Sequence, residues 1–207
     1  MSEFTYQEKP TESKLETYEW DNTWWEKTAD TEHTRVLYIG DSISCGTRRF
    51  GNMNANGEIL FDGLGTSKAI DNPFFKESVL LFARQQAHRE VILFNNGLHG
   101  FHLDDEAYAR YYADFIDFLK ENFKGVPIIL LLTTDVLGNE ERTQIVKNRN
   151  KKVLEIAAQK DCEVLDFFET ALEIGSLHTN DGVHFTDEGY SVLADSLIKT
   201  IKEVLAK

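Results

Sequence analysis

The feature that most constrains the fold is a regular alternation of short apolar runs with longer amphipathic stretches. Four runs rich in β-branched residues or leucine are bounded by Gly, Pro, Asn or Asp, at 35–41, 91–96, 127–134 and 162–167. Nearly continuous apolar runs of this kind are typical of strands that are buried on both faces of a parallel sheet. A weaker run at 57–62 completes a predicted set of five strands.

Stretches with helical periodicity follow these runs, at 72–88, 104–123, 139–160 and 186–207. The second opens with three acidic residues, which suit the positive end of a helix dipole, and Thr186 is a suitable N-cap for the last. Strands that alternate with helices are joined by right-handed crossovers. The pattern therefore predicts a three-layer α/β sandwich, in which a functional crevice lies beyond the carboxyl ends of the strands.

The length of 207 residues suits one domain with a substantial core, and no linker marks a second. We expect this domain to span 35–207, with residues 1–34 forming an aromatic arm packed on it. The arm contains a tyrosine and three tryptophans within residues 18–25. Two interpretations are open: a hydrophobic cover over a helix or the sheet, or an aromatic platform for a sugar ring or a subunit contact in a homo-oligomer.

The net charge of −13 is spread along the chain. It argues against nucleic acid or an anionic membrane surface as a partner, because both require a positive field. The first residues are polar, without the apolar core of a signal peptide, and no apolar run reaches the roughly 18 residues of a membrane span. We therefore expect a cytoplasmic protein, although a chain trimmed of its leader would look the same.

Polar residues follow every predicted strand. They are Asp41 and Ser42 after the first strand, the segments 62–67, 95–99 and 133–135 after the next three, and the loop 176–189 before the last helix. Because the carboxyl ends of parallel strands meet at one edge of a sheet, these residues are expected to share one surface. The concentration of Ser, Asn, Asp and His favours a functional site there.

The last loop contains the chemically most informative pair. Asp181 and His184 are three residues apart, so one turn can direct both side chains toward the sheet edge. A carboxylate can hold one imidazole nitrogen as a donor and leave the other free to accept a proton. Ser42 would then attack an acyl carbon, with His184 as the base and Asp181 orienting it. The structural alternatives are a helix cap for Ser42 and a surface pair for Asp181 and His184.

These two segments, "GDSI" at 40–43 and "DGVH" at 181–184, resemble the first and last motif blocks of the SGNH or GDSL hydrolases. The resemblance implies a catalytic triad of Ser42, Asp181 and His184. It also implies a flavodoxin-like parallel sheet of five strands in the order 2-1-3-4-5, and esterase activity on an ester or acetyl group. We expect no metal and no cofactor, since the triad needs neither.

The middle blocks of the family fit less closely. "GLHG" at 97–100 stands where the family has G-x-N-D, so that His99 occupies the position of the oxyanion-binding asparagine. A neutral imidazole keeps one N–H donor and a protonated one has two. Asn95 or Asn96 could instead supply the donor.

The second block normally contributes a backbone N–H to the oxyanion. In the matching region Gly65 preserves the residue type, whereas another spacing of the motif selects Ser67. Together with the N–H of Ser42, these donors would form a three-point oxyanion hole.

A serine esterase acting on an acetyl ester, with a small molecule or carbohydrate as substrate, is the leading hypothesis. The alternative is a non-catalytic flavodoxin-like module that binds a nucleotide or sugar, although no phosphate-binding glycine motif is present. A metal-dependent hydrolase would use Asp41, His99, Asp181 and His184. We expect His33, His88 and His178 to be solvated or capping residues, Cys45 to be structural, and His102 to be a further candidate for the site.

Overall fold

The computed structural model describes residues 14–207; the part of the predicted arm at 1–13 lies outside them. Within this range a single sheet has six strands in the order β1-β3-β2-β4-β5-β6. Their bounds are β1 (Asp21–Trp24), β2 (Thr34–Gly40), β3 (Ile59–Thr66), β4 (Val91–Phe94), β5 (Ile128–Leu131) and β6 (Glu163–Leu165).

The prediction of a five-stranded, wholly parallel sheet in the order 2-1-3-4-5 is wrong. An additional strand, β1, pairs antiparallel with β3, so the sheet is mixed and its order begins with this edge strand. The remaining neighbours, β3-β2-β4-β5-β6, pair in parallel. All four residues of β1 are exposed, and this is why the segment lacks the apolar pattern by which buried strands are found in a sequence.

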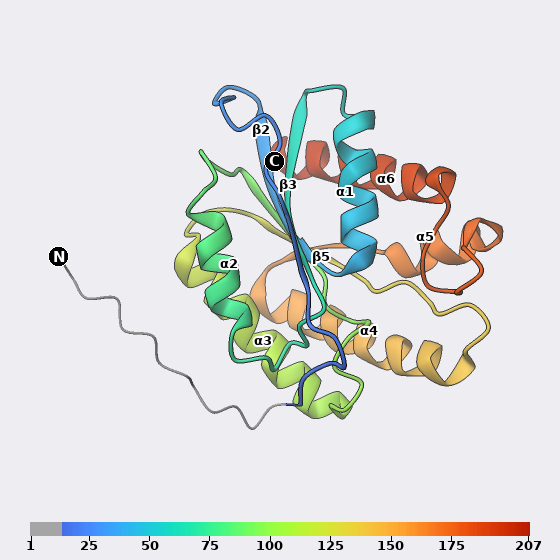
Figure 1. Cartoon of the computed structure of the whole chain (residues 1–207). Coiled ribbons are helices and arrows are strands. Elements are labelled where there is room, and N and C mark those ends of the chain that lie inside the picture. Colours follow the sequence, from blue (N-terminus) through green and yellow to red (C-terminus); the bar gives the residue numbers. More distant parts are fainter. Residues whose placement is uncertain (1–13) are drawn as a thin grey trace.

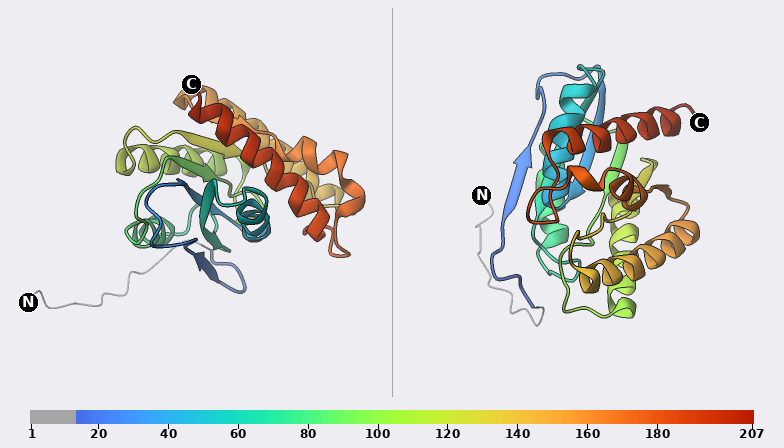
Figure 2. Two further views of the ribbon diagram at one scale, coloured as in Figure 1. Left: turned by 90° about the horizontal axis from the view of Figure 1, so that it is seen from above. Right: turned by 90° about the vertical axis from the view of Figure 1, so that its right-hand side faces the viewer.

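The sheet lies between two helical layers (Figure 1), as the alternating pattern predicts. One face packs against α2 (Phe75–Ala83), α3 (Asp105–Asn122) and α4 (Glu140–Lys160). The other face packs against α1 (Ser42–Asn54), α5 (Phe167–Glu173) and α6 (Asp187–Leu205), and a short 3-10 helix covers Gly175–Leu177. Figure 2 shows α6 crossing one side of the molecule and β1 at the outer edge of the sheet.

Side-chain caps fix where the long helices begin. Thr186 caps α6 by accepting a hydrogen bond from the N–H of Gly189, which confirms the predicted N-cap. Asp104 caps α3 in the same way, accepting from the N–H of Ala107 at 2.7 Å. These bonds satisfy N–H groups that the first turn of a helix leaves unpaired.

The strand predicted at 57–62 continues to Thr66, so Asp62 lies within β3 and not in the loop after it. It is fully buried and forms an ion pair of 2.8 Å with Arg35 of β2, which is 1% exposed. The Arg35 guanidinium also donates to three carbonyl oxygens in the segment that follows β1, those of Glu26, Lys27 and Asp30. This buried network joins the N-terminal segment to the centre of the sheet.

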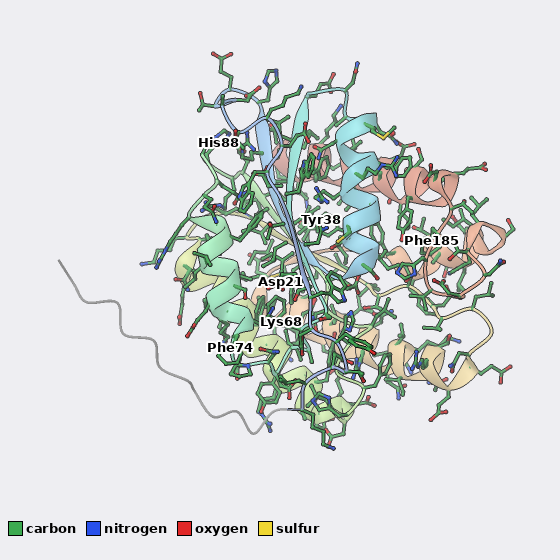
Figure 3. All side chains as sticks on the ribbon, in the orientation of Figure 1. Asp21, Tyr38, Lys68, Phe74, His88 and Phe185 are labelled. Carbon is green, nitrogen blue, oxygen red and sulfur yellow. The ribbon has the colours of Figure 1, made fainter. Side chains whose placement is uncertain are left out.

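β2 is the strand at which the direction of the sheet order reverses, because it pairs with β3 on one side and β4 on the other. Ligands of open α/β sheets bind outside the carboxyl end of such a strand. In Figure 3, Lys68 marks this end of the molecule and His88 marks the opposite end. Among residues 14–207, no helix has both the length and the apolar character needed to cross a membrane.

Candidate active site

Ser42 is the first residue of α1, at the carboxyl end of β2. Asp41 caps this helix, accepting a hydrogen bond of 2.9 Å from the N–H of Ile43 through one carboxylate oxygen. The N–H of Ser42 belongs to the first helical turn, whose N–H groups have no helical carbonyl partner and form the positive end of the dipole. The "GDS" sequence therefore positions a serine and a backbone donor at the functional edge of the sheet.

The loop before α6 is fixed by its own backbone. The N–H of Gly182 donates to the carbonyl of Thr179 at 3.0 Å, and the N–H of Thr179 donates to the carbonyl of His184 at 2.7 Å. A further bond of 2.7 Å, from the N–H of Leu137 to the carbonyl of Gly182, joins this loop to the loop after β5. Gly182 has a φ of 71°, a conformation that favours glycine.

Ser42, His184 and Asp181 form one hydrogen-bonded chain. The Nε2 atom of His184 lies 2.8 Å from Ser42 Oγ, and its Nδ1 atom lies 2.7 Å from Asp181 Oδ2. A neutral imidazole with its proton on Nδ1 fits both contacts, because Nδ1–H then donates to the carboxylate and the serine hydroxyl donates to Nε2. This geometry can activate a serine hydroxyl for attack on an electrophile.

The second carboxylate oxygen of Asp181 is held by the loop. Oδ1 accepts hydrogen bonds from the backbone N–H groups of Val183 and His184, both at 2.9 Å, and from the hydroxyl of Thr179. The bond from the His184 side chain, followed by those backbone bonds, holds the pKa of Asp181 well below its ordinary value. The carboxylate is therefore ionised and oriented before any ligand arrives.

A cleft of about 290 Å³ opens beside this chain of side chains. It brings His99 together with Ser42 and His184, as predicted, and adds residues that the sequence did not single out. The cleft is lined by Trp20, Ser42, Leu98, His99, Phe101, Val136, Arg142, Val183 and His184. Apart from Arg142 and the two histidines, the walls are mainly apolar or aromatic.

The loop that carries His99 is held by Arg149 of α4, a residue that the sequence analysis missed. Its buried guanidinium donates to the carbonyl oxygens of Gly97, His99 and Gly100 at 3.0, 2.7 and 2.6 Å. It also stacks on Tyr108, 4.5 Å from the ring centroid. Because Arg149 lies in the polar run "KNRNKK", the sequence carries no signal that separates it from exposed neighbours.

The two asparagines considered as alternatives to His99 lie outside the cleft lining. Asn95 uses both amide hydrogens within the fold, donating to the carbonyl of Leu131 and to the hydroxyl of Thr133. Asn96 is 1% exposed and donates to the carbonyl of Lys68 at 2.8 Å. An amide nitrogen carries two hydrogens, so Asn96 keeps a second one, but Asn95 has none left.

Gly65 and Ser67, the two candidates for the backbone oxyanion donor of the second motif block, lie in different environments. Gly65 lies within β3, in register with Gly40 of β2 and Asn22 of β1, and not in a loop after the strand. The N–H of Ser67 already donates to the carbonyl of Trp20 at 3.1 Å. The structure therefore does not leave the Ser67 N–H free for an oxyanion.

Two other histidines have different outcomes. His178, expected to be solvated or capping, is the C-cap of the 3-10 helix, with its ring Nδ1 3.1 Å from the carbonyl oxygen of Gly175. Its side chain is buried, with Nε2 3.4 Å from Asp135 Oδ1 and its ring 4.2 Å from that of Phe185. His102 lies 2.9 Å from Asp71 and does not line the cleft. Within the described chain, no group of three or more His, Cys, Asp or Glu side chains is arranged to hold a metal ion.

Two groups close to Ser42 in sequence, the buried Asp41 and the half-buried Cys45, have shifted pKa values. Burial raises the pKa of Asp41, although the nearby His99 and the hydrogen bond from Ile43 oppose this shift. Burial likewise raises the pKa of the Cys45 thiol to about 11, so the thiol is protonated at neutral pH. That Cys45 is structural stays a prediction.

Comparison with known proteins identifies the fold. No family model and no curated protein sequence matches the chain. Among solved structures, the acetyl xylan esterase AlAXEase superposes with a TM-score of 0.63 at 18% identity, over 81% of this chain and 99% of that one. The C-terminal catalytic domain of peptidoglycan O-acetyltransferase A from Streptococcus pneumoniae gives 0.67 at 17% identity, over 84% and 96%.

A lipolytic protein of the G-D-S-L family from Veillonella parvula gives 0.66 at 16% identity, over 80% of this chain and 97% of that one. The chain has the GDSL-lipase fold. The resemblance seen in the "GDSI" and "DGVH" segments is thus confirmed at the level of the fold.

Proposed function

We propose that this GDSL-fold protein is a serine esterase that removes a short acyl group, most simply acetyl, through an acyl-enzyme. The observation that carries the proposal is the hydrogen-bonded chain from Ser42 Oγ through His184 to Asp181. It lies at the carboxyl edge of the sheet and opens onto the cleft. A helix cap or a surface ion pair would not require the His184 ring to reach Ser42 from 142 positions away.

The reaction follows from the two hydrogen bonds. Ser42 Oγ attacks the acyl carbon while His184 Nε2 takes the hydroxyl proton, and Asp181 stabilises the resulting imidazolium. The tetrahedral intermediate collapses as His184 returns the proton to the departing alcohol, which leaves Ser42 acylated. Water then attacks the acyl carbon, again with His184 as base, and its proton is passed to Ser42 Oγ when the acid leaves.

The developing oxyanion needs preorganised donors. We assign the N–H of Ser42, in the first turn of α1, as one donor and the imidazole of His99 as another, because His99 lines the cleft with Ser42 and His184. Removal of a single donor of this kind lowers kcat by about 10²- to 10³-fold. Asn96 is the competing donor, since one of its amide hydrogens is uncommitted.

The cleft supports a small substrate. Its volume of about 290 Å³ lies at the lower end of the range for small-molecule sites. The Trp20 ring in its wall suits the apolar face of a sugar, and acetyl xylan esterases are among the proteins that share the fold. We therefore propose an acetylated carbohydrate, or another small acetyl ester, as the substrate class.

The test is hydrolysis of acetyl esters by four proteins: the wild type, Ser42→Ala, His184→Ala and Ser176→Ala. Ser176 is an exposed serine at the start of the loop 176–189, which also carries His184, and it serves as the matched control. We expect the first two substitutions to lower kcat by about 10³-fold or more, and the control to change nothing. Hydrolysis by Ser42→Ala at the wild-type rate would refute Ser42 as the nucleophile, and no hydrolysis by the wild type would favour a binding module.

A further inference from the structure

The segment before β1 reaches the candidate active site, although it lies outside the predicted catalytic domain. Trp20 is fastened to Ser67 by two hydrogen bonds: its N–H donates to Ser67 Oγ at 2.8 Å, and its carbonyl accepts from the N–H of Ser67 at 3.1 Å. The Trp20 ring then meets the imidazole of His99 edge to face, with centroids 6.4 Å apart and an interplanar angle of 75°. One wall of the cleft is therefore built by the N-terminal segment.

Glu16 makes the closest polar contacts between this segment and the His99 loop. Its Oε1 atom accepts a hydrogen bond of 2.8 Å from the N–H of Gly100 and lies 3.7 Å from Nδ1 of His99. Its backbone N–H donates to Glu19, whose other carboxylate oxygen accepts from the hydroxyl of Ser67. Hydrogen bonds that run from Glu16 through Glu19 to Ser67 thus hold Glu16 in place, and Ser67 also binds Trp20.

The backbone of the His99 loop is therefore bound by two side chains of opposite charge, Arg149 and Glu16. The Arg149 guanidinium binds the carbonyl oxygens of Gly97, His99 and Gly100, whereas the Glu16 carboxylate binds the N–H of Gly100. The positive guanidinium binds carbonyl oxygens and the negative carboxylate binds an N–H group. Hydrogen bonds with one charged partner are stronger than those between neutral groups. Of these two side chains, only Glu16 also lies close to the imidazole ring of His99, with Oε1 3.7 Å from Nδ1.

We propose that Glu16 is a positioning residue for His99, holding the imidazole toward the cleft, so that the N-terminal segment is a working part of the active site. This inference rests on the proposed function, in which His99 assists the oxyanion. Glu16 is not among the residues that line the cleft, so in this role it acts through His99. Its loss should therefore lower kcat more than it raises KM.

Two substitutions separate the contributions of Glu16. Glu16→Gln keeps an acceptor for the N–H of Gly100 but removes the charge beside His99, whereas Glu16→Ala removes both. We expect kcat to fall by about 3-fold for the first and about 10-fold for the second, within the larger loss expected for removing His99 itself. Glu32→Gln, an exposed carboxylate of the same segment, is the matched control and should leave both constants unchanged.

A double-mutant cycle tests whether Glu16 acts through His99. In a His99→Ala background, Glu16→Ala should cause no further loss of kcat, since residues that act as a unit are not additive. The imidazole NMR signals of His99 should also move in Glu16→Gln and not in Glu32→Gln. Additive losses of kcat together with unmoved His99 signals would overturn the inference.

The two proposals fail differently. Full hydrolysis by Ser42→Ala would refute the esterase proposal, whatever Glu16 does. The NMR comparison needs no turnover, so it decides whether Glu16 positions His99 even in a protein without esterase activity. A Ser42-dependent esterase in which Glu16→Ala has wild-type kcat would instead refute the role of Glu16 alone.

Discussion

At the scale of single residues, the chemistry depends on how Asp181 and His184 are oriented before a substrate arrives. Asp181 receives four hydrogen bonds within its own loop, three on Oδ1 and one on Oδ2. Both side chains are partly exposed, at 52% and 40%, so their attraction is screened by water and adds little to stability. Their arrangement is therefore better explained by a requirement of the site than by a requirement of folding.

Asp181→Asn tests this role. An amide of the same shape cannot hold Nδ1–H of His184 as a carboxylate does, so we expect kcat to fall by about 10³- to 10⁴-fold with little change in KM. Steady-state kinetics on an acetyl ester measure both constants. A kcat within 10-fold of the wild-type value would show that His184 does not need this partner.

The effect of Asp181→Asn on the stability of the protein should depend on pH. Because the folded state holds the pKa of Asp181 below its unfolded value of about 4, its stabilising effect is complete above that value and is lost as the pH falls through the folded pKa. The small difference in melting temperature between wild type and Asp181→Asn should thus shrink as the pH is lowered below about 4. A difference that grows with acidity would contradict the assigned direction.

At the scale of elements, the loop before α6 sets the geometry of the site, and Gly182 is its critical position. A Cβ atom at Gly182 would collide with the backbone carbonyl of Leu137. Gly138 has a similar φ, 78° against 71°, but open space around it. The two glycines therefore separate backbone strain from steric conflict.

We expect Gly138→Ala to cost about 1 kcal/mol of unfolding free energy, the ordinary penalty for a left-handed residue. Gly182→Ala should cost clearly more and should also lower kcat, because the loop must move away from Leu137 and take His184 with it. Urea unfolding and kinetics on the two variants provide the comparison. Equal effects of the two substitutions on both quantities would show that the Leu137 contact does not fix the loop.

The elements were predicted from the sequence where local pattern determines them. Apolar runs located the buried strands, and Thr186 marked the start of α6, because periodicity and capping are properties of neighbouring residues. The polar edge strand β1 and the buried position of Asp62 were not found, since both depend on distant partners. Glu16 and Arg149 were missed for the same reason: their contacts with the His99 loop span 84 and about 50 positions.

At the scale of the whole molecule, the buried pair of Arg35 and Asp62 joins the N-terminal segment to the central strands. Asp62 also accepts hydrogen bonds from the N–H of Glu26 and from the amide of Gln86. The contacts of Asp62 with Arg35 and with Gln86 are buried, so the loss of Asp62 leaves both partners unsatisfied away from water. The network thus supports the segment that carries Glu16 and Trp20 to the cleft.

Asp62→Asn should lower the free energy of unfolding by about 3 kcal/mol or more, because Arg35 is left as an uncompensated buried charge. Asp117→Asn, which removes an exposed ion pair with Lys160, is the control and should cost less than about 1 kcal/mol. Chemical denaturation followed by tryptophan fluorescence measures both. Similar small losses in the two variants would show that the buried network does not stabilise the fold.

The central claim is that Ser42 is a nucleophile activated by His184, and one labelling measurement tests it most directly. The protein is incubated with a fluorophosphonate, and the modified residue is identified by mass spectrometry in wild type, His184→Ala and Ser176→Ala. We expect one adduct per chain, on Ser42, which is lost in His184→Ala and retained in Ser176→Ala. An unlabelled Ser42 in the wild-type protein, or labelling that does not depend on His184, would contradict the claim.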